Sequence, residues 1–154
     1  HTPVVNAKHT NCLSESQYRD QILESYAAMR GRLYFCGHDH FLLQTTIPSS
    51  TSVLPKPDLQ QFIIGTGGVD TSHFDYKHYT DPTVYTTRDD QGKYIYWGDD
   101  TEKHIHYGYV VVTVSDDKIS TYWKGYNNDK KDYKTYFNWS MTAPSKSEKV
   151  NAAF

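Results

Sequence analysis

The chain lacks a long apolar run, an excess of basic charge and a large set of cysteines. With 154 residues it has the size of one domain. None of its apolar runs approaches the roughly 18 residues that cross a bilayer, so we expect no membrane insertion. Its 16 basic and 18 acidic side chains give a formal net charge of −2, which provides no basic surface for nucleic acid.

Cysteine is scarce, and the two that occur leave several arrangements open. Cys12 and Cys36 could pair with each other, or either could pair with a segment outside this chain. Cys36 could equally be a plain buried thiol, because it ends an apolar run. The cysteine count therefore does not identify the cellular compartment.

Tyrosine, by contrast, is abundant. The chain has 14 Tyr and three Trp residues together with many short polar residues, a composition that suits a β-rich extracellular domain. Asn138-Trp139-Ser140 is an acceptor sequon for N-glycosylation if the chain is secreted.

The residue pattern predicts one helix followed by strands. The helix is expected at residues 14–30, with Ser14 and Gln17 as a capping box and Gly31 as the stop. Its apolar stripe consists of Ile22, Leu23, Tyr26 and Met29. Strands are expected at residues 32–36, 41–47, 61–65, 107–114, 118–126 and 133–140.

Irregular structure is expected between these elements. Residues 48–57 form a Ser- and Pro-rich loop, and residues 69–107 are polar and aromatic without a clear period. The glycines of residues 65–68 predict a sharp turn or a close approach of the backbone. We expect residues 1–140 to belong to one domain and residues 141–154 to form a polar tail.

The most informative stretch is residues 34–40, Tyr-Phe-Cys-Gly-His-Asp-His. Its apolar half predicts a buried strand, and His38 and His40 follow a glycine at the end of that strand. In such a turn both imidazoles can be directed toward one region, which Gly37 leaves clear of a side chain. Imidazole nitrogens suit zinc, iron, manganese and copper, so the pattern predicts metal ligands. The histidines at positions 73, 78, 104 and 106 are expected to be ordinary surface residues.

This stretch resembles the last metal-binding motif of the calcineurin-like metallophosphoesterases. Residues 1–5, His-Thr-Pro-Val-Val, resemble the preceding motif of that family, and residues 62–68 are similar to its strand and glycine turn. Within the family, the tartrate-resistant type of purple acid phosphatase is the most similar, because it has a Cys-Gly-His-Asp-His run after a His-x-Pro-Val stretch. The resemblance extends over residues 1–126.

The resemblance implies an α/β (α+β) fold, the C-terminal half of a four-layer α/β/β/α sandwich. It also implies two metal ions, iron with zinc, iron or manganese. His1 and His38 would ligate the divalent ion from neighbouring strand ends, and His40 would ligate the ferric ion. His9 would contact the substrate phosphate or the leaving group. Asp39 lies between the two ligands in the sequence, and we expect it to point away from them and either to form hydrogen bonds within the turn or to orient a ligand histidine.

Further expectations follow from the same resemblance. Cys12 would form a disulfide with the first half of the domain, and Cys36 would be a buried free thiol. The protein would be secreted, extracellular or lysosomal, with a glycan on Asn138. The family motifs that should precede His1 are not in this chain, which therefore is not expected to assemble a dinuclear site alone.

Two functions remain after these observations. The first is hydrolysis of phosphate monoesters at a dinuclear metal centre, completed by an upstream half of the same protein. Other metallophosphoesterase reactions, such as those of nucleotidases and phosphodiesterases, are variants of it. The second is a catalytically silent, metallophosphoesterase-like glycoprotein with a structural or surface role, for which the many tyrosines would suit packing against neighbours and self-association.

Overall fold

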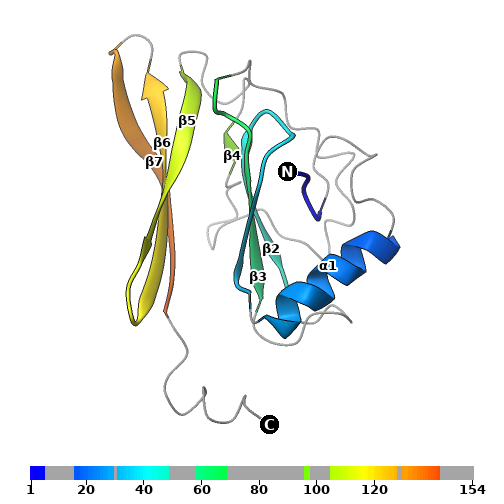
Figure 1. The fold of residues 1–154 in the computed structure, drawn as a ribbon. Coiled ribbons are helices and arrows are strands. Elements are labelled where there is room, and N and C mark those ends of the chain that lie inside the picture. The colour runs from blue at the N-terminus through cyan, green and yellow to red at the C-terminus, as the bar shows by residue number, and fades with distance from the viewer. Residues whose placement is uncertain are drawn as a thin grey trace.

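The computed structural model describes residues 1–5, 16–29, 31–48, 58–68, 96–97, 105–127 and 130–142. Within these residues the fold is mixed α+β, with one helix, a four-stranded sheet and a three-stranded sheet (Figure 1). The mixed class that the sequence predicts is therefore confirmed. In the described part of the chain, no helix is long and apolar enough to cross a membrane.

Helix α1 covers Ser16–Ala28 and packs on the four-stranded sheet through one side. Leu23 is fully buried, but Met29 is 71% exposed, so its place in the predicted apolar stripe is wrong. After the helix, the Gly31 N–H donates to the Tyr26 carbonyl at 2.7 Å. A Cβ at Gly31 would overlap the Tyr26 ring, which explains a glycine as the stop. Ser14 of the predicted capping box lies outside the described residues.

The first sheet contains β1 (Leu33–Cys36), β2 (Leu42–Ile47), β3 (Leu59–Ile64) and β4 (Tyr96–Trp97) in the order β1-β3-β2-β4. Strands β1 and β3 are parallel, whereas β2 is antiparallel to both of its neighbours. The first three strands lie where the sequence predicts them, within two residues at each end. Strand β4 falls in a segment that we expected to be irregular, and that expectation is wrong at this point.

One face of the first sheet forms the main hydrophobic core with α1 and the segment at residues 1–5. The fully buried members are Val4, Val5, Leu23, Phe41, Leu43, Ile47, Leu59 and Ile63. Each such side chain contributes about 1.5–3 kcal/mol relative to an exposed one. The buried Gln61 side chain fixes the segment, because its Oε1 accepts the N–H groups of Val4 and Val5 at 2.7 and 3.0 Å. Its Nε2 donates to the Val5 carbonyl at 3.0 Å.

The second sheet is an antiparallel meander of β5 (Ile105–Val114), β6 (Lys118–Asn127) and β7 (Asp132–Thr142). The β5–β6 turn lies where predicted, and the Ser115 N–H donates to the Lys118 carbonyl at 2.8 Å. All three strands exceed their predicted lengths by one to three residues. Met141 and Thr142 still pair with β6, so the first residues assigned to the polar tail belong to β7.

The two sheets pack face to face through Trp123, which is 2% exposed and lies against Leu42 with Ile64 and Val110 around it. Trp123 Nε1 donates to Thr66 Oγ1 at 3.4 Å. A Cβ at Gly108 would overlap the Trp123 ring, so the glycine makes room for the indole. The described layers are therefore α1, the first sheet and the second sheet (Figure 1).

Candidate metal centre

The candidate site lies where β1 and β3 end. Because these strands are parallel, both carboxyl ends meet at one edge of the first sheet, the usual place for ligands in open sheets that contain parallel strands. The Gly65 N–H donates to the Phe41 carbonyl at 3.0 Å and joins the end of β3 to the turn that follows β1. A Cβ at Gly65 would overlap the Asp39 carbonyl, so the expected close approach of bare backbone occurs here.

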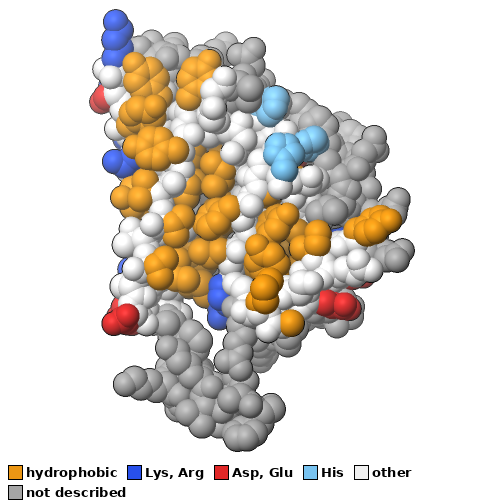
Figure 2. Space-filling view, in the orientation of Figure 1, with side chains coloured by type: hydrophobic (Ala, Val, Ile, Leu, Met, Phe, Trp, Pro, Cys, Tyr) orange, Lys and Arg blue, Asp and Glu red, His pale blue; other side chains and the backbone are white. Residues whose placement is uncertain are grey.

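His1 and His38 meet at this edge, which we call the histidine edge. Their ring centroids are 5.3 Å apart and the planes are nearly perpendicular, at 83°. Two imidazoles that share one metal at about 2.1 Å per bond cannot be more than about 8 Å apart, and this pair satisfies that limit. The Gly37 N–H donates to the His1 carbonyl at 2.8 Å and fixes the backbone of His1 beside the turn. Figure 2 shows the histidine side chains gathered on one part of the visible surface.

Gly37 leaves less free room than the sequence suggested. A Cβ built on Gly37 would lie 3.8 Å from His1 Nδ1, which is an ordinary van der Waals contact. Alanine therefore fits at this position, and only a longer side chain would reach into the space of the His1 ring. The glycine limits crowding beyond Cβ and is not required by a backbone clash.

His38 adopts a left-handed backbone conformation with a φ of 73°. A residue with a Cβ pays about 1–3 kcal/mol for such a conformation, which persists only where the surroundings hold it. Here the Asp39 N–H donates to the Gly37 carbonyl and the Phe41 N–H to the Asp39 carbonyl, both at 2.9 Å. This tight turn aims the His38 side chain at His1, and strained backbone of this kind gathers at functional sites.

Cys36 and Asp39 are the buried residues of the turn, and their exposed fractions are 8% and 1%. Burial raises the pKa of the Cys36 thiol to about 12, the chain's amino terminus opposes the rise, and Asp39 adds to it. The thiol donates weakly to the Phe62 carbonyl at 3.5 Å. Cys36 is thus the free, protonated and buried thiol that the resemblance implies.

Tyr34 attaches the first residues to β1, a contact that the sequence did not reveal. Its hydroxyl donates to the Thr2 carbonyl at 2.8 Å. Burial raises the pKa of this phenol to about 12, with smaller contributions from Cys36 and Tyr26. A tyrosine within an apolar strand, four positions before a candidate ligand, is the signal that could have suggested an anchoring hydroxyl.

The other predicted site residues are less closely connected. His40 is exposed at the far end of the turn. Across the described ranges, no group of three or more His, Cys, Asp or Glu side chains is arranged to hold a metal ion. His9 and Cys12 lie outside the described residues. Asn138 is exposed on β7, where an attached glycan would meet solvent.

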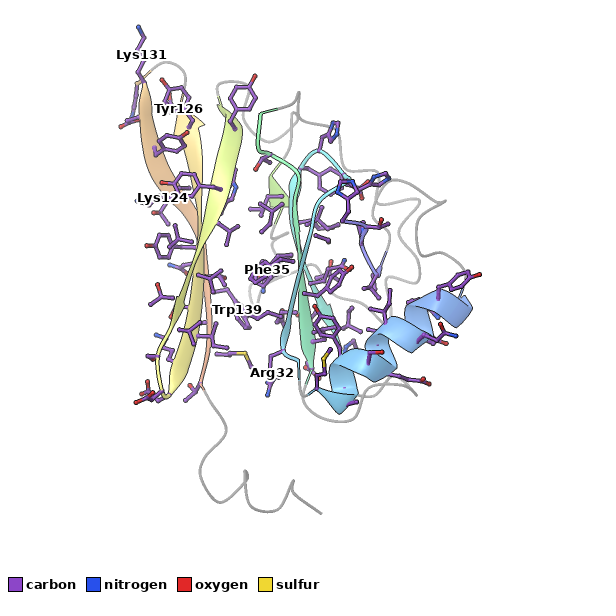
Figure 3. All side chains as sticks on the ribbon, in the orientation of Figure 1. Arg32, Phe35, Lys124, Tyr126, Lys131 and Trp139 are labelled. Atoms are coloured by element: carbon purple, nitrogen blue, oxygen red, sulfur yellow. The ribbon has the colours of Figure 1, made fainter. Side chains whose placement is uncertain are left out.

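A second concave feature lies between the two sheets, away from the histidines. This crevice is lined mainly by apolar side chains, among them Phe62, Val110, Trp123 and Trp139. The Phe62 and Trp139 rings pack edge to face there, with centroids 5.8 Å apart. Figure 3 shows Trp139 between the two sheets. No charged group lines this crevice. It is therefore part of the packing between the two sheets and not a candidate site comparable to the one formed by the histidines.

No protein-family model, curated protein or solved structure matches this chain.

Proposed function

We propose that this chain is the C-terminal half of a metal-dependent phosphatase, resembling purple acid phosphatases, that hydrolyses phosphate monoesters. The observation that supports the proposal most is the contact between His1 and His38 at the ends of parallel strands. The two residues are far apart in the sequence, and each belongs to a separate family-like motif. Their meeting is what a shared ligand site requires.

The chemistry of these residues fits a transition metal. Two imidazoles supply neutral nitrogen ligands, which suit zinc, iron and manganese. The described part of the chain provides a pair and not a full set of ligands, so the remaining ligands would come from the upstream half. When bound, two metal ions would neutralise phosphoryl charge and activate a water molecule for attack.

Each residue at the edge has a distinct task in this proposal. His1 and His38 would hold the divalent ion, and the hydrogen bonds of the turn would keep both rings in place. His40, exposed at the end of the turn, would contribute to the second, ferric position, and His9 would contact the phosphate or the leaving group. Asp39, which is buried, would stabilise the turn.

The proposal includes a fourth layer. The described residues form helix, sheet and sheet, and the upstream half would supply the second helical layer on the outer face of the second sheet. It would also supply the disulfide partner of Cys12. We further propose secretion or lysosomal delivery, with a glycan on the exposed Asn138.

The proposal is tested first by metal binding. The probe is zinc alone, titrated by calorimetry into the chain with an acetylated amino terminus, because a free α-amino group next to an imidazole is itself a chelator. We expect binding that His38→Ala abolishes, because the His38 ring lies against the His1 ring, and that His40→Ala weakens little. Equal binding by the wild type and by His38→Ala would contradict the shared site.

Activity is tested on the longer protein that contains the upstream half. With iron and zinc or manganese supplied at mildly acidic pH, we expect hydrolysis of an aryl phosphate. His38→Ala or His40→Ala should each reduce the rate about a thousandfold, since a lost metal contact removes several kcal/mol from the transition state. His104→Ala is the control and should leave the rate nearly unchanged.

A catalytically silent structural or surface protein is the second candidate. It is favoured by the exposed tyrosines on the outer face of the second sheet, where Tyr133 meets Tyr109 and Tyr126 with ring centroids 5.2 and 5.1 Å apart. Such a surface suits packing against another protein or another copy. A longer protein that carries no metal and shows no turnover would favour this candidate.

A further inference from the structure

Asn138 lies in the middle of β7, and its side chain is exposed. Successive side chains of a strand point to opposite faces of the sheet. The next residue, Trp139, packs against Phe62 between the two sheets, with ring centroids 5.8 Å apart. Asn138 therefore points away from the first sheet, and a glycan attached to it would stand on the outer face of the second sheet.

Tyr122 on β6 is the residue directly opposite Asn138. Its neighbours Thr121 and Trp123 are buried between the sheets, so Tyr122 points to the outer face together with Asn138. The Cβ atoms of directly opposite residues in an antiparallel pair are about 4.5–5.5 Å apart. The phenol ring and a sugar attached to Asn138 would therefore lie side by side.

The surroundings of this pair leave room for a sugar. In the next outward-facing row Ser120 pairs with Ser140, and both side chains are short. In the other direction Lys124 lies two residues along the same strand, with its Nζ 5.8 Å from the centroid of the Tyr122 ring. Tyr122 is only half-buried, so part of its side chain is accessible from the outer face.

An N-linked sugar suits this position chemically. One face of an N-acetylglucosamine ring presents C–H groups, and the face of an aromatic ring carries the partial negative charge that attracts them. Contact between the two removes apolar area from water. Because the sugar is covalently attached to the opposite residue, it loses much less entropy on contact than a free ligand would. A weak contact is therefore sufficient to hold the sugar against the ring.

We propose that Tyr122 is the contact surface for the first sugar of the glycan on Asn138, and that this sugar covers the middle of the outer face. The inference rests on the secretion and the glycan that belong to the proposed function. Since the sugar needs this space, the helical layer of the upstream half lies over the other end of the face, which carries Tyr109, Tyr126 and Tyr133.

Urea unfolding of the longer protein, secreted by a eukaryotic host, tests the contact. An endoglycosidase trims the glycan to its first sugar, and Asn138→Gln supplies the form without sugar. We expect the first sugar to raise the folding equilibrium constant about fivefold, the usual size of a contact between rings at a surface. The gain should disappear in Tyr122→Ala and remain in the matched control Tyr133→Ala, which lies at the other end of the same face. Equal gains in the wild type and in Tyr122→Ala would overturn the proposal.

Proton NMR of the trimmed protein supplies an independent test. Sugar protons above an aromatic ring shift upfield, and this shift should be lost in Tyr122→Leu, which keeps an apolar side chain and the strand pairing. A stability change alone would not produce such a signal. Sugar protons without an upfield shift in the wild type would contradict the proposal, and so would a secreted protein with no glycan on Asn138.

These results separate the inference from the proposed phosphatase activity, because Tyr122 lies on the second sheet and the candidate metal ligands follow the first. A stacked sugar in a protein that binds no metal would support the inference and refute the phosphatase. Metal-dependent hydrolysis in a protein whose sugar gains nothing from Tyr122 would do the reverse.

Discussion

The two sheets differ in what their faces contact. The first sheet is covered on one face by α1 and the segment at residues 1–5, and on the other by the second sheet. The second sheet is covered only on its inner face within the described residues, and its outer face carries half-exposed tyrosines. In Figure 3 Tyr126 and Lys124 lie on this outer side, while Phe35 and Trp139 lie between the sheets.

This difference indicates that the first sheet positions the candidate site and that the second sheet stabilises the first. The first sheet combines parallel and antiparallel pairing, and only the parallel pair brings two strand ends to the histidine edge. The second sheet is a regular meander whose long strands hold the Trp123 ring against the first sheet. Substitutions in the two sheets should therefore have different consequences.

The largest expected effect is at the contact between the sheets. Trp123→Ala should destabilise the protein by about 3–5 kcal/mol, because it removes a fully buried ring and leaves a cavity. Trp123→Phe, which keeps most of the ring volume but loses the hydrogen bond to Thr66, should cost clearly less. Urea unfolding of both variants measures the difference, and a loss below about 1 kcal/mol for Trp123→Ala would show that the sheets are held elsewhere.

A somewhat smaller effect is expected at the histidine edge. Gly65→Ala places a Cβ into the Asp39 carbonyl and should cost about 3 kcal/mol, because backbone must shift to relieve the overlap. Gly67→Ala is the matched control, since no atom lies within 4 Å of a Cβ there. Urea midpoints and the proton NMR signals of the histidines should change for the first variant only. Equal midpoints would contradict the close packing of the turn.

The anchor at Tyr34 should contribute about 1 kcal/mol, the usual net value of one hydrogen bond. Tyr34→Phe should show this loss near neutral pH. Because the pKa of the folded phenol is raised to about 12 from an ordinary value of 10.0, its contribution is present below about pH 10 and lost as the pH rises toward 12. Urea unfolding between pH 8 and pH 11 should therefore show a shallower alkaline loss in Tyr34→Phe than in the wild type.

A matched control for this pH dependence is Tyr133→Phe, because the Tyr133 ring is 51% exposed. It should follow the wild-type curve, including the part of the alkaline loss that the buried Cys36 thiol contributes. An alkaline slope that is unchanged in Tyr34→Phe would contradict the assigned role of its hydroxyl.

The smallest effect is expected on the outer face of the second sheet. Tyr133→Ser removes ring contacts with Tyr109 and Tyr126 from a half-exposed position and should cost less than about 1 kcal/mol. Thermal unfolding of the 154-residue chain measures it. A loss above about 2 kcal/mol would mean that this face is packed within the chain itself.

Much of the local structure could be predicted from the sequence, because it depends on near neighbours. Alternating residues in β5 and β6 and the polar turn between them specify a hairpin without outside contacts. Gly31 and Gly65 also gave reliable signals. Strand β4 gave none, because two residues, Tyr96 and Trp97, form a strand only by pairing with Leu43 and Leu42.

The candidate site was predictable in its residue types and less so in its geometry. A histidine pair after a strand and a glycine indicates metal ligands, and the motif order links His1 to His38. Neither observation contains the left-handed φ of His38 or the hydrogen bond from Gly37 to His1. Those features depend on atoms brought together by folding.

By itself, the sequence determined the helix, six of the seven described strands and the places where backbone must be bare. Periodicity is a local property, and it defines which side chains share a face but not which strand lies beside another. Only the tertiary structure decided that β1 and β3 run parallel and end together. That pairing, with Gln61 and Gly37 binding residues 1–5, brings His1 to His38, because hydrogen bonds between distant segments set distances that no local pattern contains.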